Sequence, residues 1–345
     1  MGIVINHPET PLSKLKSLSA TNRIESMREN LQNATYVIPD MAISGQITVF
    51  IAKPNSGKTL FFMYSIIEGI TRGILKPEDI FYINADDHYQ GFYEKTEIAS
   101  RHGFSMISPS EANINKDEII SLLVEMADSG QADGKVIFLD TIKKFVDMMA
   151  KRQLAEFLDT LRKLTNRGAT IIIAGHANKH LDADGKLVYE GTADQLNDVD
   201  CLYYIYRRTD KTDREQLIEF INDKDRGSVV QQRAYSYIKS HGMYEDMLKS
   251  FGRADDDAPY HLAQQKHIEE IKCAYELEFQ YLTNLLSRGE MKLNDILARH
   301  KQDKPENTSG KSIQKVLNEL DGIEWISTKK KEENNARYFR LKPKF

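Results

Sequence analysis

Short apolar runs alternate with helix-length segments along the middle of the chain. Each run is apolar at nearly every position, whereas a strand with one solvated face would be apolar at every second position. The runs cover residues 47–51, 80–84, 136–139 and 170–174. Continuous apolar strands separated by helices indicate a parallel sheet that is covered on both faces. With two further candidate strands at 201–206 and 216–221, the pattern predicts an α/β fold with a mostly parallel central sheet.

The segments on either side of this region have different patterns. Residues 1–34 are polar overall, and their apolar positions are spaced for one amphipathic helix, or two short ones, between 11 and 32. A polar stretch with Gly242, Gly252 and three consecutive aspartates follows the last strand and is typical of a loop or linker. We therefore divide the chain into four parts: an N-terminal helical segment (1–34), an α/β domain (35–240), a linker (241–260) and a C-terminal domain (261–345).

Composition limits the environment in which the chain works. It has 345 residues, of which 41% are apolar and 28% charged, so it can form about two domains and is not disordered over most of its length. No apolar run approaches the length of a membrane span, and the N-terminus lacks the features of a secretion signal. Two cysteines are too few for a disulfide framework or a zinc cluster. We expect a cytoplasmic protein with no membrane partner.

The net charge of −4 is unevenly distributed. Residues 288–345 hold 14 Lys and Arg against 9 Asp and Glu, so this end carries +5 and the rest of the chain −9. A basic end indicates a polyanionic partner, and a solvated charged surface is the alternative.

A phosphate-binding loop is the strongest chemical pattern. It lies between the strand at 47–51 and a helix at 60–70, and it ends in Gly-Lys-Thr, although Ala52 replaces the first glycine of the usual motif. The backbone N–H groups of such a loop and the N-terminus of the helix form a cradle for anions. We predict that Lys58 reaches the β- and γ-phosphates of ATP and that the Thr59 hydroxyl coordinates Mg²⁺. The predicted nucleotide-binding residues are Lys53, Pro54, Asn55, Ser56, Gly57, Lys58, Thr59 and Leu60.

Carboxylates end two of the other predicted strands. Asp140 ends the run at 136–139, about where a P-loop protein places the acid that holds Mg²⁺ and its water shell. Asp86 and Asp87 follow the run at 80–84, where one of them, with Asp86 favoured, is placed to orient and deprotonate an attacking water. An ordinary strand end for Asp140 and a helix N-cap for Asp86 or Asp87 are the alternatives.

Two later segments carry candidate cationic or polar groups. His176 follows the strand at 170–174 and is a candidate sensor of the γ-phosphate; a histidine with ordinary structural contacts is the alternative. Lys224 and Arg226 are two residues apart at the end of the strand at 216–221, so on an extended chain they point the same way. Such a pair can neutralise γ-phosphate charge across a subunit boundary, and a solvated turn is the alternative.

These five motifs, in this order, resemble the RecA-like ATPase core shared by DnaB-like and plasmid RepA-type hexameric helicases, over residues 36–237. The resemblance implies a homo-oligomeric ring, expected to be a hexamer, with active sites between subunits. Asp86 takes the place of the catalytic carboxylate, which is usually Glu, and Lys224 and Arg226 take that of the Lys-x-Arg finger. The resemblance also implies that the loops after the third and fourth strands, with Lys143 and Lys144, contact single-stranded DNA, and that the N-terminal helix docks on a neighbour.

The C-terminal domain has a pattern of its own. Helices are predicted at 291–300 and 311–320, and β-patterned runs at 324–328 and 337–341 flank a basic turn. This order resembles a winged helix-turn-helix, whose second helix would face a groove of duplex DNA; a winged helix that binds protein is the alternative.

The sequence therefore predicts an ATP-driven helicase or translocase on single-stranded DNA that serves replication of a plasmid, phage or mobile element. Two alternatives stay open. One is a RadA- or KaiC-like ATPase that remodels nucleoprotein, and the other is a DNA-binding regulator that ATP switches.

Overall fold

The computed structural model describes residues 10–17, 19, 21, 24, 35–147, 150–181, 186–190, 198–210, 212–240 and 243–343. These form two compact units, Met1–Asp256 and Asp257–Phe345. Helix α1 (Pro11–Ser17) lies within the segment 11–32 that was predicted to be helical, and most of that segment lies outside the described residues.

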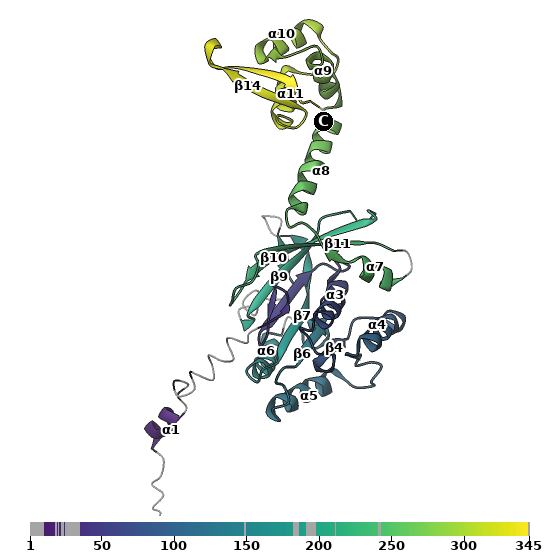
Figure 1. The fold of residues 1–345 in the computed structure, drawn as a ribbon, viewed down its shortest axis with the longest axis vertical. Coiled ribbons are helices and arrows are strands. Elements are labelled where there is room, and N and C mark those ends of the chain that lie inside the picture. Colours follow the sequence, from purple (N-terminus) through teal and green to yellow (C-terminus); the bar gives the residue numbers. More distant parts are fainter. Residues whose placement is uncertain are drawn as a thin grey trace, which may run out of the picture. The chain divides into compact units, whose positions relative to one another are not determined.

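A ten-stranded sheet forms the centre of the first unit (Figure 1). Its strand order is β12-β11-β10-β9-β3-β7-β6-β4-β5, and β8 pairs with β7. The six strands from β9 to β5 are parallel, whereas β10, β11 and β12 are antiparallel. The strands are β3 (Ile47–Ala52), β4 (Ile80–Asn84), β5 (Ser105–Ile107), β6 (Val136–Asp140), β7 (Thr170–Leu181), β8 (Leu187–Tyr189), β9 (Cys201–Arg207), β10 (Glu215–Lys224), β11 (Gln232–Ile238) and β12 (Gly252–Arg253). The predicted α/β fold with a mostly parallel sheet is confirmed.

Helices cover both faces of this sheet. Phe50 and Phe138 belong to a core shared with α3 (Lys58–Thr71), α4 (Tyr89–His102) and α7 (Tyr244–Ser250). Val49 and Leu139, one position away on the same strands, belong to a second core shared with α5 (Lys116–Asp128) and α6 (Lys151–Thr165). Successive strand residues point to opposite faces, so the continuous apolar runs follow from burial on both sides. A separate two-stranded sheet, β1 (Tyr36–Ile38) and β2 (Ala42–Ile43), precedes β3.

The segment 241–260 differs from its prediction as a linker. It contains α7 and β12, and Leu248 and Phe251 are buried in the core that α3 and α4 share. Only its last residues, from Asp257, belong to the second unit. The loop prediction is wrong because the apolar positions that anchor α7 are few and lie among glycines and acidic residues, which dominate the local composition.

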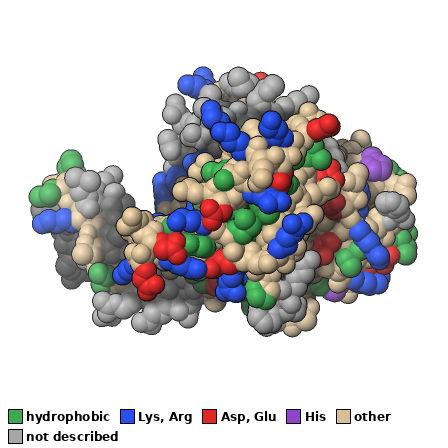
Figure 2. Space-filling view, turned by 90° about the horizontal axis from the view of Figure 1, so that it is seen from above, with side chains coloured by type: hydrophobic (Ala, Val, Ile, Leu, Met, Phe, Trp, Pro, Cys, Tyr) green, Lys and Arg blue, Asp and Glu red, His purple; other side chains and the backbone are tan. Residues whose placement is uncertain are grey.

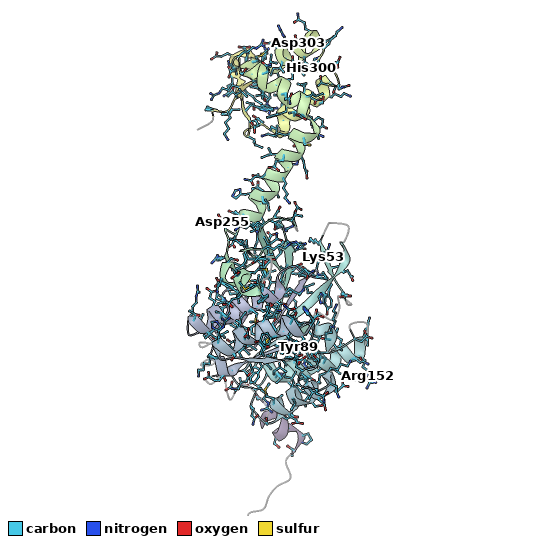
Figure 3. The ribbon with its side chains drawn as sticks, turned by 90° about the vertical axis from the view of Figure 1, so that its right-hand side faces the viewer. Lys53, Tyr89, Arg152, Asp255, His300 and Asp303 are labelled. Atoms are coloured by element: carbon cyan, nitrogen blue, oxygen red, sulfur yellow. The ribbon has the colours of Figure 1, made fainter. Side chains whose placement is uncertain are left out.

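The second unit has its own core around Trp325 and Phe339. Its elements are α8 (Ala258–Ala274), α9 (Glu276–Leu286), β13 (Met291–Lys292), α10 (Leu293–Asp303), α11 (Gly310–Glu319), β14 (Trp325–Lys330) and β15 (Ala336–Leu341). The Tyr281 hydroxyl of α9 donates to Asp303 at the end of α10 (3.1 Å), close to His300 (Figure 3). The predicted order of helix, helix, strand, turn and strand is present, and the winged-helix assignment stays a prediction.

In the described parts of the chain, no helix has both the length and the apolar character that crossing a membrane requires.

Candidate nucleotide site

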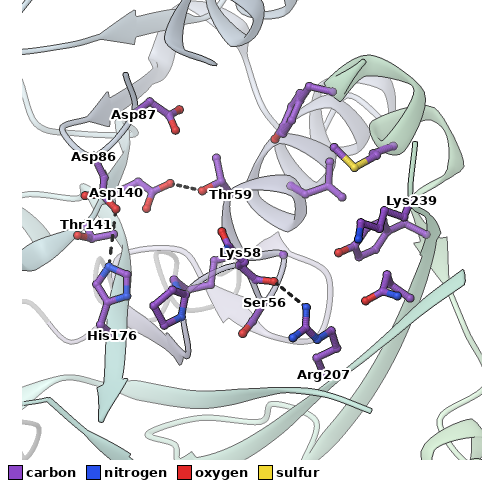
Figure 4. Close-up of a pocket in the computed structure, with 18 residues that line it drawn as sticks. Ser56, Lys58, Thr59, Asp86, Asp87, Asp140, Thr141, His176, Arg207 and Lys239 are labelled. Carbon is purple, nitrogen blue, oxygen red and sulfur yellow. Dashed lines mark hydrogen bonds and ion pairs between the residues drawn. The ribbon is translucent and has the colours of Figure 1, made fainter. Parts of the chain in front are cut away.

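A pocket of about 500 Å³ lies at the carboxyl edge of β3, β4 and β6 (Figure 4). The parallel strands direct their C-terminal residues to this edge, where ligands of open α/β sheets generally bind. The pocket brings together residues 54–60 of the predicted phosphate loop, the three strand-end carboxylates Asp86, Asp87 and Asp140, and His176. Lys53 does not line it and instead lines a neighbouring pocket of about 250 Å³.

The phosphate loop has the backbone that an anion cradle requires. Asn55 and Gly57 have positive φ angles of 60° and 87°. Glycine adopts this left-handed conformation without the steric cost that a β-carbon brings. The Ser56 hydroxyl donates to the Lys53 carbonyl (2.7 Å) and closes the turn. The loop therefore leads directly into the N-terminus of α3, where unpaired backbone N–H groups and the helix dipole favour negative charge.

Lys58 is buried at the centre of the pocket. Only 7% of the residue is exposed, and its Nζ donates a long hydrogen bond to the Ala52 carbonyl (3.4 Å). Burial lowers the pKa of Lys58 to about 8, while the nearby carboxylates of Asp140 and Asp86 act in the opposite direction. A buried ammonium group with so few compensating contacts is poised to accept an anionic ligand.

Asp140 links the phosphate loop to β4. Its Oδ2 atom accepts hydrogen bonds from the hydroxyls of Thr59 and Tyr82, both at 2.7 Å. Burial raises the pKa of Asp140, and these hydrogen bonds and the charge of Lys58 oppose that shift. A hydroxyl and a carboxylate are oxygen donors of the kind that Mg²⁺ prefers, and proteins usually hold Mg²⁺ with one or two carboxylates plus substrate phosphates. The Thr59–Asp140 pair fits such a site.

Asp86 and Asp87 have different environments although they are adjacent. The Asn84 side chain orders the turn, since its Oδ1 accepts the N–H groups of both aspartates (3.2 and 3.1 Å). Asp87 is held by the amide of Asn84 (2.7 Å) and by the buried ammonium of Lys95 (2.8 Å). Asp86 is more exposed and contacts Lys144 at 3.2 Å. Asp87 is therefore committed to structural contacts, whereas Asp86 faces the pocket.

His176 is buried beside Asp86. Burial, followed by the charges of Lys58 and Lys143, lowers the pKa of His176 to about 4. The imidazole is therefore neutral at pH 7, and its 3.8 Å separation from Asp86 is too long for a hydrogen bond. Neither ring nitrogen has a hydrogen-bond partner among the described residues.

Lys224 and Arg226 lie at the opposite edge of the sheet. In the strand register, Lys224 is opposite Leu202 and Arg226 contacts Asp200 (3.3 Å), whose N–H donates to the carbonyl of Ile47 at the start of β3. The phosphate loop follows the other end of β3, about 17 Å away along the strand. The structure therefore does not bring this pair to the pocket of its own chain.

The buried carboxylate of Asp200 anchors this second edge. Its Oδ2 accepts from the Ile47 N–H (2.9 Å) and from Arg162 (2.6 Å), which leaves Oδ1 for Arg226. The side chain of Arg226 is about half exposed despite this contact.

The sequence analysis missed one wall of the pocket. Arg207, Gln216, Tyr237 and Lys239 come from the antiparallel strands or their ends, and Tyr244 and Met247 come from α7. Figure 4 shows Arg207 and Lys239 on one side of Lys58 and the carboxylates on the other. Isolated polar or aromatic residues at strand ends form no motif, so no sequence signal distinguishes them.

No protein-family model matches the chain, and no curated protein matches it. Among solved structures, one that matches is the ATPase domain of a DnaB-like helicase. It is 11% identical, has a TM-score of 0.48, and the match covers 69% of this chain and 99% of that one.

Proposed function

We propose that this chain is a magnesium-dependent ATPase with a RecA-like core. The observation that carries the proposal is the convergence of Lys58, Thr59, Asp140 and Asp86 on one pocket at the carboxyl edge of the sheet. The loop 53–57 and the N-terminus of α3 bind the phosphates, and Lys58 supplies a positive charge. Thr59 and Asp140 hold Mg²⁺, which when bound neutralises charge on the phosphates.

Asp86 is the proposed general base. It is within the pocket and is not tied by the two contacts that hold Asp87, so its carboxylate is available to accept a proton from water. Asp87 and Asn84 then have a positioning role, because they fix the turn that carries Asp86. The neutral imidazole of His176, with both nitrogens unpaired in the described structure, is suited to contact the γ-phosphate.

We infer that the site is completed by a neighbouring subunit. Lys224 and Arg226 are too far from the phosphate loop of their own chain, so they can neutralise phosphate charge only on another copy. A head-to-tail contact that is repeated around an axis forms a closed ring, in agreement with the hexamer that the sequence resemblance implies.

The proposed substrate track is single-stranded DNA, and the proposed activity is helicase or translocase activity in replication of a plasmid, phage or mobile element. Lys143 and Lys144 follow β6 as a basic segment, as a phosphate-contacting loop requires. On the face shown in Figure 2, Lys and Arg side chains are interspersed with Asp and Glu side chains among the described residues. Contacts with DNA phosphates would therefore be local rather than spread over one large basic surface.

The second unit supports a second candidate, a DNA-binding regulator that ATP switches. It has a separate core and carries Lys311 and Gln314 on exposed positions of α11, as a winged helix that reads duplex DNA would. The two candidates differ in whether ATP hydrolysis is coupled to movement along DNA.

The testing experiment measures ATP hydrolysis and unwinding of a forked DNA by the full chain and by Lys58→Ala. We expect the wild type to hydrolyse ATP, to be stimulated by single strands and to unwind the fork, and Lys58→Ala to do none of these. Stimulation by one specific duplex without unwinding would favour the regulator. Full turnover by Lys58→Ala would refute the nucleotide site.

A further inference from the structure

A tyrosine hydroxyl from α7 lies buried in the pocket without a hydrogen-bond partner. Tyr244 is the first residue of α7 and lines the pocket, and its hydroxyl oxygen is inaccessible to solvent. No described residue forms a hydrogen bond with this oxygen. Buried hydroxyls are nearly always paired, so an unpaired one at the wall of a ligand pocket calls for an explanation.

The ring of Tyr244 is held in place from several sides. The Nζ atom of Lys95 lies 4.6 Å from the ring centroid, and that ammonium is itself buried and fixed by Asp87 (2.8 Å) and the Gly91 carbonyl (3.0 Å). Further along α7, Leu248 is buried in the core, which fixes the helix that carries the tyrosine. Tyr244 therefore cannot turn its hydroxyl to solvent without breaking packed contacts.

The surroundings of the hydroxyl make it a hydrogen-bond donor. Burial, together with the carboxylates of Asp140 and Asp87, raises the pKa of Tyr244 well above its usual value, so the phenol keeps its proton. Asp140 already accepts hydrogen bonds from Thr59 and Tyr82 through one oxygen. The Tyr244 hydroxyl thus lies near the carboxylate that fits Mg²⁺, with its proton not committed to any described acceptor.

We propose that Tyr244 is a nucleotide-binding residue whose hydroxyl donates to an acceptor oxygen that the magnesium nucleotide brings into the pocket. This oxygen is either a phosphate oxygen or a metal-bound water. The inference rests on the proposed ATPase function and adds α7, an element outside the phosphate loop and the strand ends, to the binding site. Helix α7 then forms a wall of the pocket that is completed only when nucleotide binds.

The inference makes a prediction of opposite signs for the free and the bound protein. In the free protein the unpaired hydroxyl is a cost, so Tyr244→Phe, which keeps the ring, should unfold at the same temperature as the wild type or at a higher one. In the bound protein the same substitution removes a hydrogen bond to a charged ligand, so nucleotide should bind roughly tenfold more weakly. A purely structural tyrosine would not give this pair of effects.

Tyr203→Phe is the matched control. The Tyr203 hydroxyl donates to the Val230 carbonyl (2.7 Å), and Tyr203 does not line the pocket. The same chemical change there should lower the unfolding temperature of the free protein and leave nucleotide affinity unchanged.

The experiment is thermal unfolding and calorimetric binding of the full chain with three additions: a nonhydrolysable ATP analogue with Mg²⁺, ADP with Mg²⁺, and the analogue with EDTA. A smaller ligand-induced rise in unfolding temperature for Tyr244→Phe than for the wild type supports the inference. Loss of that difference in EDTA assigns the acceptor to metal-bound water, and its restriction to the analogue assigns it to the γ-phosphate. An equal rise in both proteins refutes the role of Tyr244, whereas no rise in the wild type refutes the proposed nucleotide site and with it this inference.

Discussion

The buried ammonium of Lys58 should make the nucleotide-free protein less stable than a variant that lacks it. Lys58→Met keeps the aliphatic stem and removes the charge, and it also removes the group proposed to bind phosphate. We therefore expect this substitution to abolish nucleotide binding and at the same time to stabilise the free protein. Most substitutions of buried residues destabilise, so the direction of this change is a stringent test.

The magnitude follows from the pKa of Lys58. Burial lowers this pKa from 10.5 to about 8, and each pH unit corresponds to about 1.4 kcal/mol. Below pH 8 the lysine is charged in both the folded and the unfolded states, and the folded state bears the full cost, about 3 kcal/mol. As the pH rises from 8 toward 10.5, the folded lysine loses its proton before the unfolded one, and the cost falls. At pH 9.5 about 1.4 kcal/mol should remain.

The assay is urea unfolding of wild type and Lys58→Met at pH 7 and pH 9.5, followed by far-ultraviolet circular dichroism. The only tryptophan, Trp325, lies in the second unit, so its fluorescence reports that unit and serves as an internal control. The variant should be more stable by about 3 kcal/mol at pH 7, with a gap about half as large at pH 9.5. A variant that is less stable at pH 7, or a gap that does not narrow at the higher pH, would refute the assignment of a strained ammonium to this site.

Three other predictions concern turnover. Asp86→Asn should lower single-turnover hydrolysis by roughly 10²–10⁴-fold because it removes the proposed base, whereas Asp87→Asn should have a smaller effect; the reverse order would reassign the base. Arg226→Ala and Lys58→Ala should each be inactive alone but regain about a quarter of the active sites when mixed in equal amounts, and no recovery in steady-state ATPase assays would argue against shared sites. Lys144→Ala should raise hydrolysis in the absence of DNA and reduce its stimulation by single strands, because Lys144 contacts Asp86 at 3.2 Å; unchanged rates with and without DNA would separate this lysine from the site.

The parts of the site that could be predicted from the sequence are those fixed by local chain geometry. Strand, loop and helix are contiguous around Lys58, and the ends of parallel strands must meet at one edge, which brings Asp140 near Thr59. The different environments of Asp86 and Asp87 could not be predicted in this way. That difference depends on Lys95, which reaches Asp87 from the next helix, and a sequence pattern does not report such a contact.

The wall formed by α7 and the antiparallel strands could not be predicted for a related reason. Tyr237 is an ordinary residue of an alternating strand, and Tyr244 lies in a segment whose glycines and aspartates favour a loop. Their place in the pocket follows from the pairing of β10 with β11 and the packing of α7 on α3 and α4. These are contacts between elements that are far apart in the sequence, and burial energy rather than local propensity determines them.

The antiparallel strand β10 joins the two edges of the sheet. Gln216, near its start, lines the nucleotide pocket, and Lys224, at its end, lies with Arg226 at the edge anchored by Asp200. The strand is hydrogen-bonded on both sides, to β9 and to β11, so it transmits displacement along its length rather than bending between the two sites. If the proposed ring forms, each subunit therefore connects its own nucleotide to the cations that it offers to its neighbour through one rigid element. Sequential hydrolysis around a ring requires a connection of this kind. A parallel strand in the place of β10 would not provide it, because such a strand would end at the pocket edge and bring the cations that follow it to the phosphate loop of its own chain.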